Sequence, residues 1–328
     1  MTERSTVLLG LAYPSLWDQR AADVIERDVA ALRAVDPRIE VVRCPPGATD
    51  ARVLARLDIL VGLHLPPDLP STAPRLRWVQ AIGAGVGHLL PADLHARGIR
   101  LSTASGVNAV PVAEFAFARV LGHFKRFAEL DRAQREQRWT PYYGEPLAGR
   151  TLGVLGLGAI GTEVAVRARA FGMRVSAVRR SAERPTPHAD TLHGPDRLRS
   201  MLAECDAVVA ALPETPQTID MMDEAAFAAM PAGAFFCNVG RGSCVVEEAM
   251  VDALRSGQLG GAAIDVTRLE PLPAASPLWH APNLAISAHS ASAAGAHFTG
   301  VFRLLRHNLA RYLASERLIN EVDTTIGY

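Results

Sequence analysis

The sequence predicts an α/β protein made of two Rossmann-like domains, and three observations support this prediction. Short apolar runs suited to parallel strands alternate with helical segments along most of the chain. With 328 residues, the chain exceeds the usual size of a single core, so two domains are expected. A Gly-x-Gly-x-x-Gly pattern, made by Gly156, Gly158 and Gly161, directly follows one of the apolar runs.

The first hundred residues are expected to form a small domain of strands and helices without a glycine pattern at its first turn. Strands are expected over 6–12, 39–43, 58–64, 78–82 and 99–103, and a helix over 21–35. The loop Gly83-Ala84-Gly85-Val86-Gly87-His88 follows the fourth strand. Its backbone amides could converge on an anion such as a substrate carboxylate. A turn made flexible by three glycines explains the same residues equally well.

The segment 111–137 has helical periodicity, which predicts one long helix that carries the chain into the second domain. Residues 139–149, which include prolines and two tyrosines, are expected to form an irregular connector. A second helix, over 297–313, is expected to pack back on the first domain.

The glycine pattern lies between an expected strand over 151–155 and a helix over 159–171 that ends at Gly172. Gly156 permits a tight turn, Gly158 lets a pyrophosphate approach the backbone, and Gly161 lets the helix pack closely. A second strand over 174–178 then ends at Arg179 and Arg180, where such folds read the adenosine ribose. Arginine suits the 2′-phosphate of NADP better than the hydroxyls of NAD, and a solvated strand end is the alternative interpretation.

The rest of the second domain continues the alternation. A polar loop is expected to about residue 195, followed by a helix to 204. Further strands are expected over 206–212, 234–239, 261–266 and 284–288, with helices over 224–230 and 247–255. Together with the two strands beside the glycine pattern, these make six strands of a doubly wound parallel sheet.

Composition argues against several classes of protein. Lysine plus arginine equals aspartate plus glutamate at 34 each, so no global field would recruit nucleic acid or an acidic membrane. We see no spanning segment and no signal peptide, so a cytoplasmic protein is expected. The four cysteines lack metal-ligand spacing, so we expect buried reduced thiols and no metal site.

Three ionisable residues follow three successive strands of the second domain: Arg241, Glu270 and His289. The carboxyl ends of parallel strands meet at one edge of a sheet, so these side chains can face one site. An arginine fork can hold a carboxylate and polarise a neighbouring carbonyl, and a histidine beside a carboxylate can exchange a proton. These groups suit reversible hydride transfer to a 2-oxo acid. Taken singly, each could instead be an ordinary surface or turn residue, and Asp265 could equally contact a nucleotide or form buried hydrogen bonds.

These motifs resemble the D-isomer-specific 2-hydroxyacid dehydrogenases. The resemblance covers nearly all of residues 76–291 and rests on the following stretches: 155–161, Asn238-Val-Gly-Arg-Gly242, Ile264-Asp-Val266, Glu270-Pro-Leu-Pro273, Ser276-Pro-Leu-Trp279, and His289 after Pro282-Asn283. Within the family, the two arginines, the proline-rich stretches and the closing Gly327-Tyr328 are most similar to NADPH-using glyoxylate/hydroxypyruvate reductases.

The resemblance implies a dinucleotide domain, residues 104–291, inserted into a flavodoxin-like substrate domain made of 1–103 and 292–328. It implies that His289 is the acid/base, that Glu270 supports it and that Arg241 binds the substrate. It further implies carboxylate-binding amides at Ala84 and Gly85, and a homodimer built on 111–149. NADP(H) is the expected cofactor, with NAD(H) possible. The implied cofactor contacts are Gly156, Gly158, Ala159, Ile160, Gly161, Arg179, Arg180, Ser181, Leu212, Pro213, Thr218, Val239, Gly240 and Asp265.

The chain departs from the family pattern at two positions. Gly87 stands where an aspartate is frequent, and Ala288 replaces the usual proline before the histidine. Two alternatives remain beside a reductase of small 2-oxo acids. One is an NAD-dependent dehydrogenase for a larger or phosphorylated acid. The other is a nucleotide-sensing protein similar to the corepressors that resemble this family.

Overall fold

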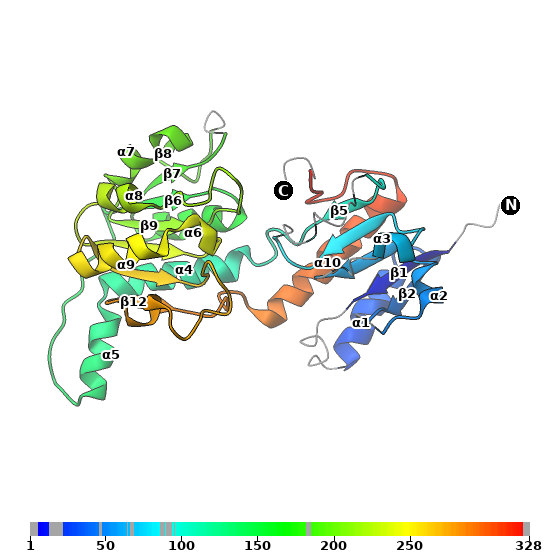
Figure 1. Ribbon diagram of the computed structural model, residues 1–328, viewed down its shortest axis with the longest axis horizontal. Helices are drawn as coiled ribbons and strands as arrows, with labels where there is room; N and C mark the ends of the chain where they lie inside the picture. Colours follow the sequence, from blue (N-terminus) through cyan, green and yellow to red (C-terminus); the bar gives the residue numbers. More distant parts are fainter. Residues whose placement is uncertain are drawn as a thin grey trace. The chain divides into compact units, whose positions relative to one another are not determined.

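The computed structural model describes residues 6–12, 22–45, 48–63, 65, 69–85, 89, 94, 96–181 and 185–323. The chain divides into two compact units. Unit 1 contains Met1–Val107 and Ala294–Tyr328, and unit 2 is the continuous segment Asn108–Ala293 (Figure 1). Each unit is built on one sheet of parallel strands, which confirms the predicted α/β class.

Unit 1 has a five-stranded parallel sheet in the order β2-β1-β3-β4-β5, the order found in flavodoxin-like folds. Its strands are β1 (Val7–Leu11), β2 (Ile39–Arg43), β3 (Ile59–Gly62), β4 (Trp78–Ala81) and β5 (Arg100–Ser102). Its helices are α1 (Ala22–Arg33), α2 (Ala51–Leu54), α3 (Leu69–Thr72) and α10 (Ala294–Leu313). The predicted strands are therefore confirmed within two residues at each described end.

Helix α10 returns to unit 1 and covers one face of its sheet, as predicted. Apolar residues of α10, among them Phe302 and Leu305, share a core with Leu9 and Ile59 of the sheet. A buried network of polar side chains also joins α10 to the sheet. Asn308 Nδ2 of α10 donates to Gln80 Oε1 of β4 at 3.1 Å, an oxygen that also accepts from Ser102 Oγ at 2.8 Å. Because such groups are costly to bury unpaired, the network fixes how α10 lies on the sheet.

Unit 2 has a seven-stranded parallel sheet in the order β12-β11-β10-β9-β6-β7-β8. The strands are β6 (Thr151–Leu155), β7 (Arg174–Val178), β8 (Thr191–His193), β9 (Ala207–Ala210), β10 (Ala234–Asn238), β11 (Leu259–Ile264) and β12 (Leu284–Ile286). From β8 to β11 this is the order of doubly wound dinucleotide folds, with β12 added at the far edge.

Helices cover both faces of this sheet, which is why its strands are apolar on both sides. One layer contains α4 (Ala109–Phe124) and α6 (Ala159–Ala170). The other contains α7 (Leu198–Leu202), α8 (Glu224–Ala229) and α9 (Glu247–Ser256). Short 3-10 turns lie at Pro195–Arg197, Gly242–Cys244 and Pro277–His280.

The segment predicted as one helix over 111–137 is instead two helices, α4 and α5 (Phe127–Arg135). They are separated at Arg126, which has a left-handed φ of 57°. The irregular connector explains the break, because Glu145 N donates to the Phe124 carbonyl at 2.8 Å. A side chain at Gly144 would lie 2.5 Å from the same carbonyl, so glycine permits this approach.

The prediction of six strands in the second domain was also wrong, because β8 lies in the segment expected to be a polar loop. This strand has three residues and, among the described strands, pairs only with β7, at the sheet edge. Thr191 Oγ1 and Ser176 Oγ are 2.8 Å apart, and Asp190 Oδ2 accepts from Val175 N at 2.8 Å. These contacts between distant segments, rather than an apolar pattern, define the strand.

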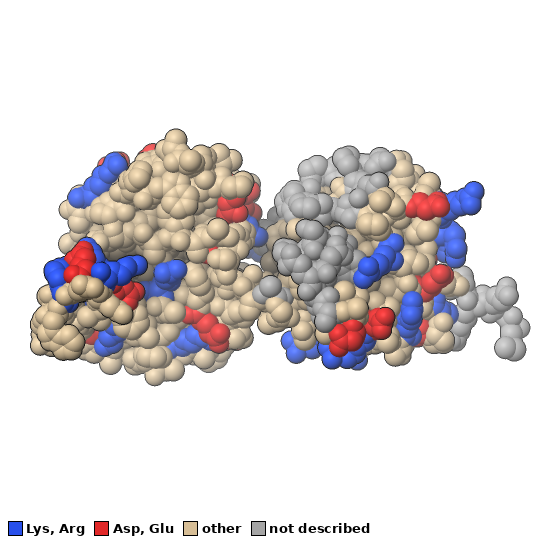
Figure 2. Space-filling model, turned by 90° about the horizontal axis from the view of Figure 1, so that it is seen from below, with Lys and Arg blue, Asp and Glu red and all other residues tan. Residues whose placement is uncertain are grey.

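The surface carries basic and acidic side chains next to one another on the face shown in Figure 2. No helix in the described part of the chain is both long enough and apolar enough to cross a bilayer. All four cysteines are buried and unpaired, as predicted. Burial raises the pKa of Cys205 and of Cys237 to about 12, so these thiols stay protonated near neutral pH.

Protonation of His123 is expected to destabilise unit 2. Its ring stacks on Phe235 with centroids 4.6 Å apart, and burial lowers its pKa below the ordinary value of 6.5. The unfolded chain therefore takes up a proton at a higher pH than the folded chain does. The stability that neutral His123 contributes is complete above about pH 6.5 and is lost as the pH falls through the folded-state pKa.

Urea unfolding at about pH 7.5 and about pH 5.5 measures this effect. The loss of unfolding free energy at the lower pH should be smaller in His123→Gln than in the unsubstituted chain. Exposed His280→Gln is the control and should behave as the unsubstituted chain does. His297, whose pKa burial also lowers, acts in the same sense in unit 1 and is unchanged in both variants. An equal loss in His123→Gln would contradict the assignment.

Candidate active site

The glycine turn between β6 and α6 has the shape that a pyrophosphate needs. Gly156 adopts a positive φ of 89°, and a Cβ on Gly161 would lie 2.0 Å from the Gly156 carbonyl. Neither position therefore tolerates a side chain. Above Gly158, by contrast, a Cβ would meet no atom within 4 Å, and this residue caps α6 without any side-chain hydrogen bond. Open space thus lies beside the helix N-terminus, where anions are stabilised.

Two further turns lie along the same edge of the sheet. A Cβ on Gly240 would lie 2.6 Å from both the amide nitrogen and the carbonyl oxygen of Leu212, so the turns after β9 and β10 pack backbone to backbone. Thr218 accepts from the Thr215 amide at 2.9 Å, and its hydroxyl donates to the Pro213 carbonyl at 2.7 Å. The Thr218 hydroxyl therefore shapes the loop after β9, while Val239 is buried beneath the next turn.

The end of β7 carries the two arginines singled out in the sequence. Arg179 Nε donates to the Ser181 carbonyl at 2.8 Å, which bends the side chain along the turn. Its Nη2 is buried and has no hydrogen-bond partner. Arg180 is exposed. A phosphate would supply acceptors for such a guanidinium, so this corner fits a phosphorylated ribose.

His289 and Glu270 are brought together, as the order of strands predicted. The His289 Nδ1 atom lies 2.9 Å from Glu270 Oε2, with both side chains partly open to solvent. The other carboxylate oxygen, Glu270 Oε1, accepts from the Thr267 amide at 3.1 Å. The carboxylate is therefore held between the Thr267 amide and the imidazole. Because the contact uses Nδ1, the Nε2 atom of His289 points away from Glu270 and can bond another partner.

Asp265 organises the turn that carries His289. It is 4% exposed, and its Oδ1 accepts from Ser287 Oγ at 2.6 Å and from the Ser290 amide at 2.9 Å. Both carboxylate oxygens also accept from the Ala291 amide at 3.1 Å. The His289 amide donates to the Asp265 carbonyl at 2.8 Å. Of the two interpretations left open by the sequence, these contacts favour buried hydrogen bonding.

His289 itself has a left-handed φ of 50°, a conformation that costs a non-glycine residue about 1 kcal/mol or more. The chain adopts it because the hydrogen bonds to Asp265 specify the turn on either side. The imidazole is thus held by its backbone on one side and by Glu270 on the other.

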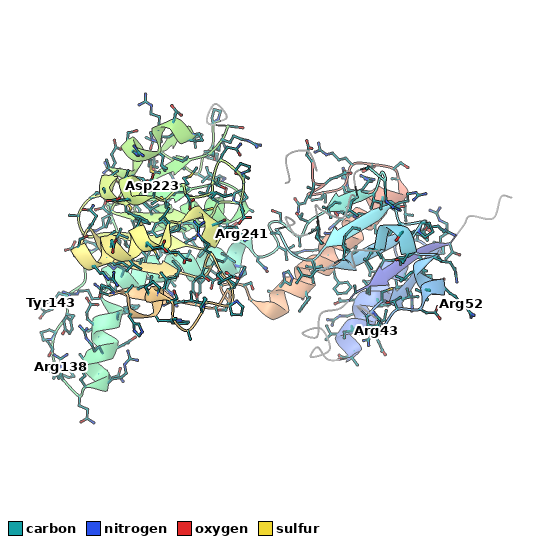
Figure 3. All side chains as sticks on the ribbon, viewed as in Figure 1. Arg43, Arg52, Arg138, Tyr143, Asp223 and Arg241 are labelled. Carbon is teal, nitrogen blue, oxygen red and sulfur yellow. The ribbon has the colours of Figure 1, made fainter. Side chains whose placement is uncertain are left out.

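The loop after β10 presents Arg241 (Figure 3). Asn238, only 1% exposed, braces this loop from both sides: its Nδ2 donates to the Arg241 carbonyl and its Oδ1 accepts from the Gly240 amide, each at 3.0 Å. Arg241 Nη1 donates to the Gly240 carbonyl at 2.7 Å. Among the described contacts it bonds neither Glu270 nor His289, so most of the guanidinium remains for another partner.

Gly242 connects the Arg241 loop to the Glu270 loop. A Cβ at this position would lie 2.0 Å from the Thr267 carbonyl carbon, so the two backbones are in direct contact. Arg268 reinforces the contact, because its Nη2 donates to the Val245 carbonyl at 2.9 Å and pairs with Asp220. The loops that carry Arg241 and Glu270 therefore pack directly against each other.

Ala159 and Ile160 are the first residues of α6. Ala84 and Gly85 belong to unit 1, where they follow β4; Val86, Gly87 and His88 of the same loop lie outside the described residues. The closing Gly327-Tyr328 also lies outside them.

Sequence reasoning missed the supporting residues Asn238, Thr267 and Ser287. Only Asn238 carried a signal, as the first residue of the Asn-Val-Gly-Arg-Gly stretch. The Thr267 amide and the Ser287 hydroxyl act through contacts that the sequence alone does not reveal.

Sequence comparison identifies relatives of the chain. The profile of the D-isomer specific 2-hydroxyacid dehydrogenase NAD binding domain matches residues 117–291. The glyoxylate/hydroxypyruvate reductase A of Serratia proteamaculans is 33% identical over 233 residues, which are 69% of this chain and 74% of the relative. A glyoxylate reductase of Korarchaeum cryptofilum is 32% identical over 279 residues, covering 80% and 83% respectively.

Solved structures of the same family are also similar to this chain. A D-isomer specific 2-hydroxyacid dehydrogenase family protein from Aeromonas salmonicida superposes with a TM-score of 0.85 at 30% identity, over 98% of this chain and 100% of the other. An NADPH-dependent glyoxylate/hydroxypyruvate reductase from Sinorhizobium meliloti, in complex with NADP and sulfate, gives 0.82 at 28% identity over 99% and 100%. The chain therefore belongs to the D-isomer-specific 2-hydroxyacid dehydrogenases, and it is an NAD(P)-dependent oxidoreductase acting on CH–OH groups.

Proposed function

We propose that the protein reduces a small 2-oxo acid of the glyoxylate or hydroxypyruvate type to the D-2-hydroxy acid, with NADPH as the preferred cofactor. The observation that carries the proposal is the His289–Glu270 contact beside the Arg241 loop on adjoining strand ends. The relatives named as glyoxylate and hydroxypyruvate reductases support the choice of substrate class.

In this proposal the chain supplies three functions to the reaction. Arg241 holds the substrate carboxylate and polarises the adjacent carbonyl with the donors that Gly240 does not engage. His289 delivers a proton from Nε2 to the carbonyl oxygen, since Nδ1 faces Glu270. Glu270 fixes the ring orientation and compensates the positive charge of the imidazolium. The nicotinamide, when bound, supplies the hydride.

The remaining roles follow the same proposal. Unit 2 is the dinucleotide domain and unit 1 the substrate domain, whose Ala84 and Gly85 amides would bind the substrate carboxylate. The open space above Gly158 would receive the pyrophosphate. Arg179 and Arg180 would bind the 2′-phosphate, which the unpartnered Arg179 Nη2 supports. Asp265 would act at the cofactor site by positioning the adjoining turns, because its carboxylate and its backbone N–H and carbonyl all make hydrogen bonds within the chain. The cytoplasmic location stays a prediction.

We further propose a homodimer built on the arm formed by α5 and the connector 136–149. Several large apolar side chains of this arm are exposed: Phe127 at 50%, Trp139 at 103% and Tyr143 at 85%. Figure 3 shows Tyr143 on the connector beside α5. Such a concentration of exposed apolar side chains is typical of an interface.

Initial rates with glyoxylate, hydroxypyruvate, pyruvate and phenylpyruvate, each with NADPH and NADH, test the proposed activity. We expect the two small acids with NADPH to give the highest kcat/KM. A preference for phenylpyruvate or for NADH would contradict the substrate or the cofactor choice separately. Turnover of none of these acids would favour an unusual substrate or a sensing role.

His289→Ala should lower kcat by roughly 10² to 10⁴, the usual contribution of a positioned acid/base. Binding of NADPH, followed by its fluorescence, should be retained.

Arg241→Ala should lower kcat and raise KM together, because the guanidinium contacts substrate before and during reaction. Exposed Arg255→Ala on α9 is the matched control and should leave both constants unchanged. Unchanged kinetics in Arg241→Ala would remove that residue from the site.

Replacing both Trp139 and Tyr143 by serine should weaken the dimer, because both side chains would lose apolar burial at the interface. Sedimentation velocity over a range of protein concentrations should show a dimer that dissociates more readily in the variant. The control is Ile319→Ser, an exposed apolar residue of unit 1. A monomeric unsubstituted chain at all concentrations would refute the proposed homodimer.

A further inference from the structure

Two buried side-chain nitrogens have no hydrogen-bond partner at the carboxyl ends of neighbouring strands of unit 2. They are Arg179 Nη2 and His193 Nε2, and no other buried side-chain nitrogen or oxygen in the described part of the chain lacks a partner. Buried polar atoms in folded proteins are normally hydrogen-bonded, and each exception requires an explanation. The coincidence of both exceptions in one corner of the sheet points to a polar ligand.

The two residues are direct neighbours across β7 and β8. His193 is the last residue of β8 and pairs with Val178, the last residue of β7. Arg179 follows immediately, and its amide donates to the His193 carbonyl at 3.1 Å. Arg179 lies beyond the end of β7, so the alternation of side chains along that strand does not determine the face of the sheet on which its side chain lies. The Arg179 side chain is instead positioned by the hydrogen bond from its Nε to the Ser181 carbonyl.

The chemistry of this corner is that of a phosphate site. At the end of the second strand of a dinucleotide fold, a carboxylate would accept the ribose hydroxyls of NAD. Here that position is Arg179, and the neighbouring strand adds an imidazole. A guanidinium and an imidazole N–H are both donors, and a phosphate monoester offers three terminal oxygens as acceptors.

We infer that His193 is a further specificity determinant for NADPH: its Nε2–H donates to the 2′-phosphate beside Arg179. This inference rests on the proposed preference for NADPH and extends it from the strand end that the sequence singled out to the neighbouring edge strand. In the absence of a 2′-phosphate the imidazole would have no such acceptor. His193 would therefore favour NADPH over NADH without contacting the reacting atoms.

Isothermal titration calorimetry on the full chain, with adenosine 2′,5′-bisphosphate and with adenosine 5′-monophosphate, tests this inference without relying on turnover. The two ligands differ only in the 2′-phosphate. His193→Ala should weaken binding of the bisphosphate about tenfold or more, the effect of losing one charge-assisted hydrogen bond, and should leave binding of the monophosphate unchanged. Arg179→Ala is the positive control and should show the same pattern.

Thr191→Val is the matched control for the integrity of β8. Thr191 lies at the other end of this strand, where its hydroxyl contacts Ser176 Oγ at 2.8 Å. Valine keeps the branched shape and removes only that contact, so both affinities should stay as in the unsubstituted chain. A loss in Thr191→Val equal to that in His193→Ala would show that the strand, and not the imidazole, is responsible, and would overturn the inference.

The remaining outcomes separate the inference from the proposed function. If the unsubstituted chain prefers the bisphosphate but His193→Ala retains that preference, the role of His193 is refuted and the preference for NADPH stands. The same holds if His193→Ala weakens both ligands equally, since the residue would then support the adenosine or the strand. If the unsubstituted chain binds both ligands equally, the proposed NADPH preference fails and the inference fails with it.

Discussion

The buried carboxylate of Asp265 is the interaction on which the candidate active site depends. It lies one residue beyond the end of β11 and accepts hydrogen bonds from the segment that follows β12. A carboxylate buried this deeply would be costly without such donors, and the donors would be costly to bury without it. The hydrogen bonds between the carboxylate and these donors therefore hold the ends of β11 and β12 together. It also explains how His289 can hold a left-handed backbone conformation.

From this anchor, a series of short contacts extends across the edge of the sheet. Glu270 connects the imidazole to the Thr267 amide, and the backbone at Thr267 lies against Gly242. Gly242 directly follows Arg241, whose loop is braced by Asn238. Apart from the contact between the imidazole and the carboxylate, each of these contacts involves backbone atoms, which are positioned by the parallel strands beneath them. Rigid strands therefore hold residues from three loops in one arrangement, and this is what preorganised catalysis requires.

The nucleotide side of the same edge is built differently, by the exclusion of side chains. Gly156, Gly161 and Gly240 each lie where a Cβ would collide with a neighbouring backbone. Within the Gly-x-Gly-x-x-Gly pattern, Gly158 is the position where a Cβ would meet open space. The spacing of glycines thus combines two requirements, close packing of turns and access for a ligand. At the far end of this edge, Arg179 Nη2 and His193 Nε2 are buried without hydrogen-bond partners, and our proposal assigns the 2′-phosphate of NADPH to this corner.

The sequence by itself determined the α/β class, nearly all strands, the glycine turn and the order of arginine, glutamate and histidine. These features are local: apolar runs define buried strands, and residues after successive parallel strands must share one edge. The sequence did not determine the break at Arg126 or the strand β8, because both depend on hydrogen bonds to segments distant along the chain. The two uses of Asp265, as a nucleotide contact or a buried acceptor, were equally compatible with its position in the sequence. Only the tertiary structure decided which donors surround its carboxylate, because a residue's hydrogen-bond partners come from whichever strands the fold places beside it.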